Sequence, residues 1–267
     1  MKKEGIDVLL AEQGFFDSRE KAKRAIMAGI VHDEHDIIDK PGTKIPVDSK
    51  LYVKGKVLPY VSRGGLKLEK AIKEFNLDLK DKIMVDIGSS TGGFTDCALQ
   101  NGAKLVYAID VGTNQLVWKL RNDPRVVVKE QTNFRYATKE LFEYGIPSFA
   151  SIDVSFISLK YIFEPLKDIL SNSDQVVALI KPQFEAGREE VGKKGIVKDA
   201  KIHHQVIENV IEFAHNNNFE LEQLTFSPIT GGEGNIEFLG LFVKDGIFNS
   251  DINIDEVVNN AHDCFKR

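Results

Sequence analysis

The chain has 267 residues, of which 42% are hydrophobic and 28% are charged, with a formal net charge of −5. These proportions are typical of a folded globular protein and exclude a disordered, collagen-like or disulfide-rich chain. The sequence has no apolar run of about eighteen residues that could span a membrane, and its first residues are too polar for a signal peptide. The two cysteines match no metal-ligand spacing, so we expect a cytoplasmic protein with reduced thiols.

The first sixty residues have the pattern of a small α+β module. Residues 6–16 place apolar side chains at helical spacing. Asp17 and Glu20 have the separation of a capping box ahead of a second helical stretch, which ends at Gly29. Residues 30–53 then become strand-like. The pattern predicts two short helices followed by a small twisted sheet.

The second of these helices is basic, and a basic stretch follows it between Lys50 and Lys73. Its sequence, DSREKAKRAIMAGIV, and the order of elements resemble the α-L RNA-binding module that is named after a small-subunit ribosomal protein. The resemblance implies that the basic helix faces RNA, where lysine and arginine bind phosphates without reading sequence. A merely solvated charged face is the alternative. The residues in this part of the chain that we expect to bind RNA are Arg19, Lys21, Lys23, Arg24 and Arg63.

A helical pattern over residues 66–75 leads into a regular alternation of strands and helices. The predicted strands are 82–87, 104–110, 125–130, 148–154 and 175–181, and the predicted helices are 94–101, 113–121, 136–144 and 158–170. This alternation predicts a doubly wound parallel sheet.

A longer helix, 199–216, precedes two final strands at 219–227 and 236–243. The loop between these strands is too short for a crossover helix, so they should form an antiparallel hairpin. A parallel sheet that ends in such a hairpin resembles the class I methyltransferase variant of the Rossmann fold. The predicted domains are an RNA-binding domain, a linker and a methyltransferase domain, at residues 1–58, 59–62 and 63–267.

The segment VDIGSSTGGFTD follows the first strand of the sheet and opens a helix, which is the context of a glycine-rich cofactor loop. Gly88 lets the chain leave the strand, and Gly92 and Gly93 would let the backbone approach a ligand. The spacing departs from the dinucleotide pattern G-x-G-x-x-G. It resembles the S-adenosylmethionine loop, in which an acid, here Asp86, helps to position the amino acid end of the cofactor. A purely structural tight turn is the alternative.

Two further polar residues end the next strands. Asp110 lies 22 residues after Gly88, close to the offset at which a carboxylate can bind a ribose diol. Asn133 follows the third strand, where this fold usually lines the adenine, although Asn is equally common in turns. The predicted S-adenosylmethionine contacts are Asp86, Gly88, Ser89, Ser90, Gly92, Gly93, Phe94, Asp110, Val111 and Asn133.

The end of the fourth strand indicates which atom receives the methyl group. It reads SIDVSF, with Asp153, and lacks the Pro-Pro-aromatic pattern of many N-methyltransferases and the cysteine of C5-pyrimidine enzymes. Together with Lys67, Lys181 and Glu237 it gives the order Lys, Asp, Lys, Glu, which is similar to the tetrad of FtsJ-like RNA ribose 2′-O-methyltransferases. With its amino-terminal module, the chain resembles the TlyA family, which is also labelled hemolysin-like and methylates ribosomal RNA.

The resemblance assigns a role to each residue of the tetrad. A ribose hydroxyl is too weak an acid to ionise unaided, so Lys181 would act as the base or as the cation that stabilises the alkoxide. Asp153 would orient that ammonium, and Lys67 and Glu237 would hold the ribose. Each residue alone could equally be an ordinary surface charge.

Residues 187–198, GREEVGKKGIVK, form a glycine-rich segment that we name the lip. We expect it to be mobile and to contact substrate phosphates through Arg188, Lys193 and Lys194, with a solvated loop as the alternative. His203 and His204 are adjacent on a helix and project about 100° apart, so we expect no metal site there.

These features predict an S-adenosylmethionine-dependent ribose 2′-O-methyltransferase that acts on ribosomal RNA or ribosomal subunits. One alternative is a non-catalytic RNA-binding or ribosome-assembly protein that kept the fold. The other is a hemolysin that acts on membranes, although no membrane-spanning or strongly amphipathic basic helix supports it.

Overall fold

The computed structural model of the chain describes residues 3–34, 38, 40–54, 58–192, 194–231 and 234–266. Contacts between residues divide the chain into two compact units, Met1–Arg63 and Gly64–Arg267. Within the described residues, no helix is long and apolar enough to cross a membrane.

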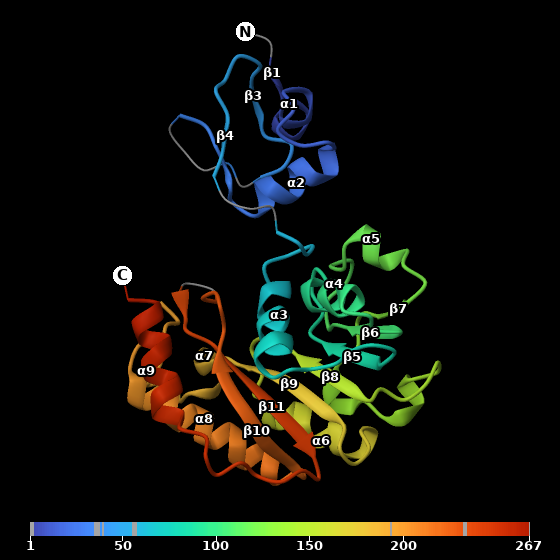
Figure 1. The fold of residues 1–267 in the computed structure, drawn as a ribbon, viewed down its shortest axis with the longest axis vertical. Helices are drawn as coiled ribbons and strands as arrows, with labels where there is room; N and C mark the ends of the chain where they lie inside the picture. The colour runs from blue at the N-terminus through green and yellow to red at the C-terminus, as the bar shows by residue number, and fades with distance from the viewer. Residues whose placement is uncertain are drawn as a thin grey trace. The chain divides into compact units, whose positions relative to one another are not determined.

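Among its described residues, the first unit contains two helices and two pairs of short strands. Figure 1 shows it at the blue end of the chain. The helices are α1 (Ile6–Glu12) and α2 (Arg19–Met27). Strand β1 (Lys3–Gly5) pairs antiparallel with β3 (Lys44–Pro46), and β2 (Val31–His32) pairs antiparallel with β4 (Tyr52–Val53). The predicted α+β module is confirmed, but its sheet is split in two and one strand precedes the first helix.

Helix α2 begins one residue later than the predicted capping box requires. Ser18, with an extended backbone, accepts a hydrogen bond from the Lys21 backbone N–H at 3.3 Å and is the N-cap. Asp17 instead binds the Lys21 ammonium at 2.5 Å, and Glu20 pairs with Lys23 at 3.5 Å. The predicted cap at Asp17 is therefore wrong, because the Asp17 carboxylate pairs with the Lys21 ammonium and leaves the backbone N–H of Lys21 to Ser18.

The second unit is built on a seven-stranded sheet with the order β10-β11-β9-β8-β5-β6-β7 (Figure 1). Strands β5 to β9 are mutually parallel, and β11 runs antiparallel to both β9 and β10, which confirms the predicted class I methyltransferase sheet and its final hairpin. The strands are β5 (Ile83–Ile87), β6 (Leu105–Ile109), β7 (Val126–Lys129), β8 (Phe149–Ile152), β9 (Gln175–Ile180), β10 (Phe219–Phe226) and β11 (Phe238–Lys244).

Helices cover both faces of this sheet (Figure 1). On one face, Val85, Ile152 and Phe242 of the strands share a buried core with Phe163 of α6 and Val210 of α8. On the other, α3 and α4 contact each other and α4 contacts β6. The helices are α3 (Gly65–Glu74), α4 (Gly93–Gln100), α5 (Trp118–Arg121), α6 (Lys160–Ile169), α7 (Pro182–Glu185), α8 (Ala200–His215) and α9 (Ile254–Cys264).

The helix predicted over 136–144 is absent, and two 3₁₀ turns, η1 (Phe134–Tyr136) and η2 (Lys139–Leu141), take its place. The buried Tyr107 explains the difference. Its hydroxyl accepts a hydrogen bond from the Tyr144 N–H at 2.7 Å and donates one to the Gly145 carbonyl at 3.1 Å. These bonds use backbone groups that a continuing helix would need, so local propensity is overridden by a tertiary contact.

The helix predicted over 113–121 is reduced to α5. The Glu130 carboxylate accepts hydrogen bonds from the backbone N–H groups of Asn114 and Gln115 at 2.8 and 3.1 Å. Asn114 also has a left-handed φ of 59°. An acid directly after strand β7 therefore holds these residues as a loop at the edge of the sheet.

The antiparallel direction of β11 decides where the polar residues of the second unit meet. Phe238, at the start of β11, pairs with Ile180, at the end of β9. Glu237 and Lys181, the residues next to this pair, are thereby brought to one edge of the sheet. The end of the parallel strand β8, followed by Asp153, lies at the same edge.

A fragment that begins at Tyr60 should fold on its own, because the sheet and its helices contain a complete core in the second unit. We expect its circular dichroism to show helix and strand and its thermal unfolding to be cooperative. The full chain, measured in the same buffer, is the control. A fragment without a cooperative transition would contradict the prediction.

Candidate active site

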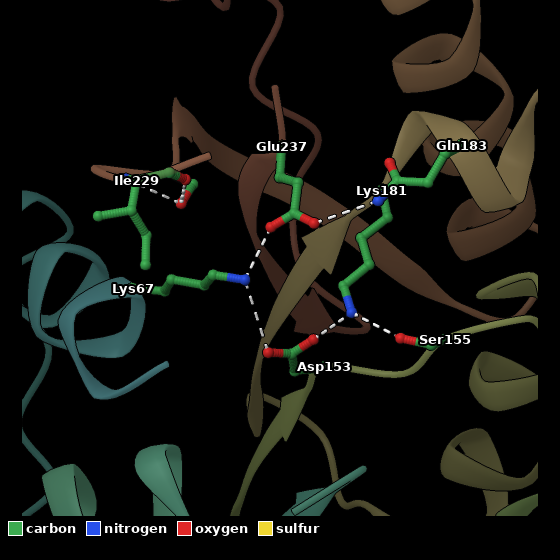
Figure 2. A network of polar contacts seen from close by, with 8 residues as sticks. Lys67, Asp153, Ser155, Lys181, Gln183, Ile229 and Glu237 are labelled. Carbon is green, nitrogen blue, oxygen red and sulfur yellow. Dashed lines mark hydrogen bonds and ion pairs between the residues drawn. The ribbon is translucent and has the colours of Figure 1, made fainter. Parts of the chain in front are cut away.

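Four charged side chains from separate elements meet at the carboxyl edge of the sheet (Figure 2). The Asp153 carboxylate lies between two ammonium groups, with Oδ1 2.5 Å from Lys181 Nζ and Oδ2 3.8 Å from Lys67 Nζ. Lys67 Nζ also lies 2.7 Å from Glu237 Oε2. The structure thus brings together all four members of the predicted tetrad.

The four charges are largely shielded from water. Lys67, Lys181 and Glu237 are 8%, 9% and 2% exposed, and Asp153 is half-buried. Two ammonium groups balance two carboxylates, which is the condition under which buried charges are tolerated. Removing a single partner would leave an uncompensated buried charge, at a cost of about 3–5 kcal/mol in comparable networks.

Two neighbours that the sequence analysis missed complete this network. Lys181 Nζ donates a hydrogen bond to Ser155 Oγ at 3.1 Å, and Gln183 Nε2 donates one to Glu237 Oε1 at 3.3 Å. Gln183 Oε1 is buried and has no hydrogen-bond partner among the described residues. Both residues stand two positions after a tetrad member, in IDVSF and IKPQFE, which is the signal that could have identified them.

Glycine at position 231 is required by the Glu237 carboxylate. A Cβ atom on Gly231 would collide with Glu237 Oε1, so a larger residue would displace the carboxylate that pairs with Lys67. The paired glycines of SPITGGEGN were the sequence signal for this close approach.

Glu185 fastens the turn after β9 to the segment after β8. Its carboxylate accepts hydrogen bonds from Ser158 Oγ at 2.7 Å and from the Leu159 N–H at 2.8 Å, at the start of α6. Burial raises the pKa of Glu185 to about 7. The segments that carry Lys181 and Asp153 are therefore linked a second time, away from their own ion pair.

The glycine-rich loop packs directly against the tetrad. Gly88 has a φ of 84°, and a Cβ atom there would collide with the carbonyl oxygen of Asp153. Gly92, with a φ of 100°, begins α4, and its Cβ atom would collide with Leu116 and Leu120. Protein packing and backbone conformation therefore also require glycine at position 92, and its approach to a ligand stays a prediction.

Asp86 lies beneath this loop and is fully buried. It accepts hydrogen bonds from Thr95 Oγ1 at 2.7 Å and from Ser151 Oγ at 3.0 Å, so it joins β5 to α4 and β8. Burial raises the pKa of Asp86 to about 7, against the hydrogen bonds from Thr95 and Ser151 and with a smaller contribution from the charge of Asp153. Its contact with a cofactor stays a prediction.

Asp110 is held at the next strand end by the loop itself. Its carboxylate accepts hydrogen bonds from the N–H groups of Ser90 and Gly112, both at 2.8 Å. Asn133 accepts a hydrogen bond from the Arg135 N–H at 3.1 Å and so caps η1. Of the remaining residues predicted to contact the cofactor, Val111 is exposed, whereas Ser89, Gly93 and Phe94 are buried.

The basic residues of α2 are mostly paired with acids of their own unit. Arg19 lies 2.8 Å from the buried Asp7 and ties α2 to α1, while Lys21 and Lys23 bind acids one turn away. Arg24 is half-buried and Arg63 is exposed. Contact of these residues with RNA stays a prediction.

The lip has exposed cations at Arg188 and Lys194, and the predicted contact Lys193 lies outside the described residues. Lys194 and Lys198 line a surface hollow of about 420 Å³ together with Glu190. Whether substrate phosphates are bound here stays a prediction.

The two adjacent histidines of α8 have protein partners. His203 Nε2 donates a hydrogen bond to the Val197 carbonyl at 3.1 Å, so its Nδ1 accepts one from His262 Nε2 at 3.0 Å. Burial, reinforced by His262, lowers the pKa of His203 to about 4. His204 pairs with Asp255, and no cluster of three potential metal ligands occurs in the described part of the chain.

Comparison with known proteins places this geometry in context. The model of the FtsJ-like methyltransferase family matches residues 60–244. The chain is 64% identical over 238 residues to YqxC of Bacillus subtilis, named as a candidate rRNA methyltransferase, covering 89% of this chain and 85% of that protein. It is 37% identical over 234 residues to the 16S/23S rRNA (cytidine-2′-O)-methyltransferase TlyA of Mycobacterium tuberculosis, covering 87% of each chain. A solved structure described as a candidate hemolysin, from Streptococcus thermophilus, is 57% identical with a TM-score of 0.79, covering 99% of this chain and 98% of that one.

The buried Asp86 predicts a specific pH dependence of stability. Its pKa is raised on folding from the ordinary value of 3.8 to about 7. The stability that this carboxyl contributes is therefore fully present at low pH and is lost as the pH rises through about 7. Thermal unfolding followed from about pH 4 to about pH 8 should show a larger loss in the native chain than in Asp86→Asn, in which the buried Glu185, whose pKa is also raised to about 7, still contributes.

Asp168→Asn, at an exposed position of α6, is the matched control and should follow the native chain. Parallel melting curves for the native chain and Asp86→Asn across the whole pH range would contradict the prediction.

Proposed function

The chain belongs to the FtsJ-like methyltransferase family, and from this premise we propose that it transfers a methyl group from S-adenosylmethionine to a ribose 2′-hydroxyl of ribosomal RNA. Relatives named as rRNA (cytidine-2′-O)-methyltransferases support cytidine as the target nucleoside. The observation that carries the proposal is the Lys67–Glu237 and Lys181–Asp153 network at the carboxyl edge of the sheet.

This network suits an oxygen nucleophile. A ribose hydroxyl becomes reactive only as it loses its proton, and a lysine nitrogen beside it can take that proton or balance the developing charge. Among the described residues, Lys181 Nζ has two polar partners, Asp153 and Ser155, so one further position around this nitrogen is left for a substrate oxygen.

The roles of the four residues follow from their contacts. Lys181 would act as the neutral amine, after its ammonium has released one proton to solvent. It would take the hydroxyl proton as the ribose oxygen gains the methyl group and the carbon–sulfur bond of the donor breaks, and Asp153 and Ser155 would stabilise the resulting ammonium. Lys67 is held by Glu237 and Asp153, across Asp153 from Lys181 (Figure 2). From there it would bind the ribose. Alignment supplies much of the rate in such a transfer, because the donor is already activated.

S-Adenosylmethionine, when bound, supplies an activated methyl group on a sulfonium. The glycine-rich loop and the end of β6 fit this ligand. Asp110 is fixed by two backbone N–H groups and retains acceptor capacity for a ribose diol. Gly88 packs so closely against the Asp153 carbonyl that it has no room for a Cβ atom, so this loop lies next to the tetrad. We assign the cofactor contacts to Asp86, Gly88, Ser89, Ser90, Gly92, Gly93, Phe94, Asp110, Val111 and Asn133.

We assign RNA capture to two sets of cations. Lys21, Lys23, Arg24 and Arg63 of the first unit would bind phosphates of folded ribosomal RNA, and Arg188 and Lys194 would bind phosphates near the target nucleotide. Arg19 has mainly a structural part, because its guanidinium is committed to the buried Asp7. Exchanging a neighbouring acid, Asp17 or Glu20, for a phosphate costs Lys21 and Lys23 little, since such exposed pairs are weak.

Replacing Lys181 tests the reaction. The native chain should transfer radiolabelled methyl groups from S-adenosylmethionine to ribosomal RNA, and Lys181→Ala should lower the single-turnover rate about 10²–10⁴-fold. Binding of the cofactor, measured by calorimetry, should change by no more than a few-fold, because the loss falls on the transition state. Absence of methyl transfer by the native chain to any ribosomal RNA would refute the proposed function.

Two further variants separate proton transfer from charge. Lys181→Arg should also fail, since a guanidinium does not release a proton at neutral pH and its planar fork reaches differently. Glu237→Ala should be less severe, because Glu237 positions Lys67. A native single-turnover rate in Lys181→Arg would reduce the role of Lys181 to a fixed positive charge.

RNA binding should depend on the first unit. Joint replacement of Lys21, Lys23 and Arg24 by Ala should weaken binding of ribosomal RNA and flatten its salt dependence, because fewer counterions are released. A filter-binding titration at several salt concentrations measures both effects. Replacing the exposed Lys80 and Lys104 of the second unit by Ala is the control and should leave the salt dependence unchanged. Equal affinities in all three proteins would assign RNA capture to other residues.

A further inference from the structure

The lip is fastened to the rest of the second unit by the side chain of Asn235. The amide Nδ2 donates a hydrogen bond to the Gly195 carbonyl at 2.9 Å, and Oδ1 accepts one from the Val197 N–H at 3.0 Å. Asn235 is only 3% exposed. Both ends of one buried amide therefore hold the lip backbone, and losing either bond while the amide stays buried would leave an unpaired polar group.

The backbone of Asn235 reaches the tetrad in the other direction. Its carbonyl accepts a hydrogen bond from the Gly231 N–H at 2.8 Å. Gly231 is the residue whose missing Cβ leaves room for Glu237 Oε1. A shift of Asn235 would therefore move the Gly231 backbone, which packs against the Glu237 carboxylate. Glu237 in turn binds Lys67 Nζ at 2.7 Å.

The lip is also anchored from α8. The Val197 carbonyl accepts a hydrogen bond from His203 Nε2 at 3.1 Å, so both backbone polar groups of Val197 are used. Arg188 and Lys194, in contrast, are exposed. The lip therefore combines a segment that is hydrogen-bonded to Asn235 with two exposed cations, Arg188 and Lys194, that are accessible to a polyanion.

We propose that Asn235 is a positioning residue that couples phosphate binding by the lip to the placement of Glu237. The proposal rests on the proposed function and adds to it a form of regulation by the substrate. RNA phosphates on Arg188 and Lys194 favour the lip arrangement that Asn235 holds, and this arrangement keeps Gly231 against Glu237. By reciprocity, an ordered tetrad strengthens binding of RNA by the lip.

Two substitutions at position 235 separate the hydrogen bond to Val197 from the hydrogen bond to Gly195. Asn235→Asp keeps the acceptor for the Val197 N–H and loses the donor to Gly195, whereas Asn235→Ala loses both. We expect kcat for ribosomal RNA to fall by up to about a hundredfold in Asn235→Ala and by less in Asn235→Asp. The dissociation constant for S-adenosylmethionine should change by no more than about twofold in either variant, because the cofactor loop is untouched.

The matched control is Asn217→Ala, which removes a comparable bond from Asn217 Nδ2 to the Phe213 carbonyl at the end of α8, 2.8 Å long. This variant should keep the native kcat. If Asn235→Ala folds and keeps the native kcat, the proposal is overturned. If Asn235→Ala does not fold, Asn235→Asp decides, and a native kcat in the folded Asn235→Asp overturns the proposal.

A double-mutant cycle distinguishes coupling from mere stabilisation. Replacing Arg188 and Lys194 by Ala should lower kcat in the native chain, but in the Asn235→Ala background it should raise KM and leave kcat unchanged. Reductions of kcat that multiply independently in the combined variant would show that the lip and Asn235 act separately.

Amide hydrogen exchange tests the physical link without any reaction. In the absence of RNA, Asn235→Ala should accelerate amide exchange at both Val197 and Gly231. The Val197 N–H loses its side-chain acceptor. The Gly231 N–H keeps its acceptor, the backbone carbonyl of residue 235, but that carbonyl is no longer held in place by the side chain. Native exchange at Gly231 with faster exchange at Val197 would overturn the proposal. Since this measurement needs no methyl transfer, its failure is distinguishable from failure of the proposed function.

Discussion

The Asp153 carboxylate is the interaction on which the rest of the second unit depends. It lies between the ammonium groups of Lys67 and Lys181, and its carbonyl lies where a Cβ atom on Gly88 would be. A lysine in so buried a place is stable only when a carboxylate balances it, so the two lysines cannot be close without Asp153 between them. The glycine-rich loop, the tetrad and the strand end of β8 are therefore mutually constrained by one residue.

The sheet supplies this residue with its partners through strand direction. Parallel strands deliver Asp153 and Lys181 to one edge, and only an antiparallel neighbour of β9 can deliver the residue that precedes a strand, Glu237, to the same edge. This arrangement has a cost in stability, because burial raises the pKa of Asp86 to about 7 and ionising this carboxyl destabilises the fold. Close packing at Gly88 and Gly231 leaves no room for larger residues at these positions. Such local conflicts with stability are expected where a site must be rigid.

The sequence predicted the elements of the sheet well, because its strands are short apolar runs between turn signals and its final loop is too short for a crossover. The comparisons confirm the family that the sequence resembles, while the roles of Lys67, Asp153, Lys181 and Glu237 stay predictions. The elements that the sequence predicted wrongly are determined by contacts between residues far apart in the chain. Tyr107 prevents a helix near Tyr144, and Glu130 prevents one near Asn114. Their partners are far along the chain and leave no periodic signal.

The tetrad itself is electrically balanced, with two ammonium groups against two carboxylates, so it offers a polyanion no net attraction. Attraction for RNA must come from cations outside it, and in a chain of net charge −5 these are concentrated in few places. The proposed reaction therefore separates capture from chemistry. Phosphates meet the exposed cations of the lip and of the first unit, while the buried charges stay paired until a ribose enters. A contact such as Asn235, which joins an exposed cationic segment to a buried carboxylate, lets the first event influence the second.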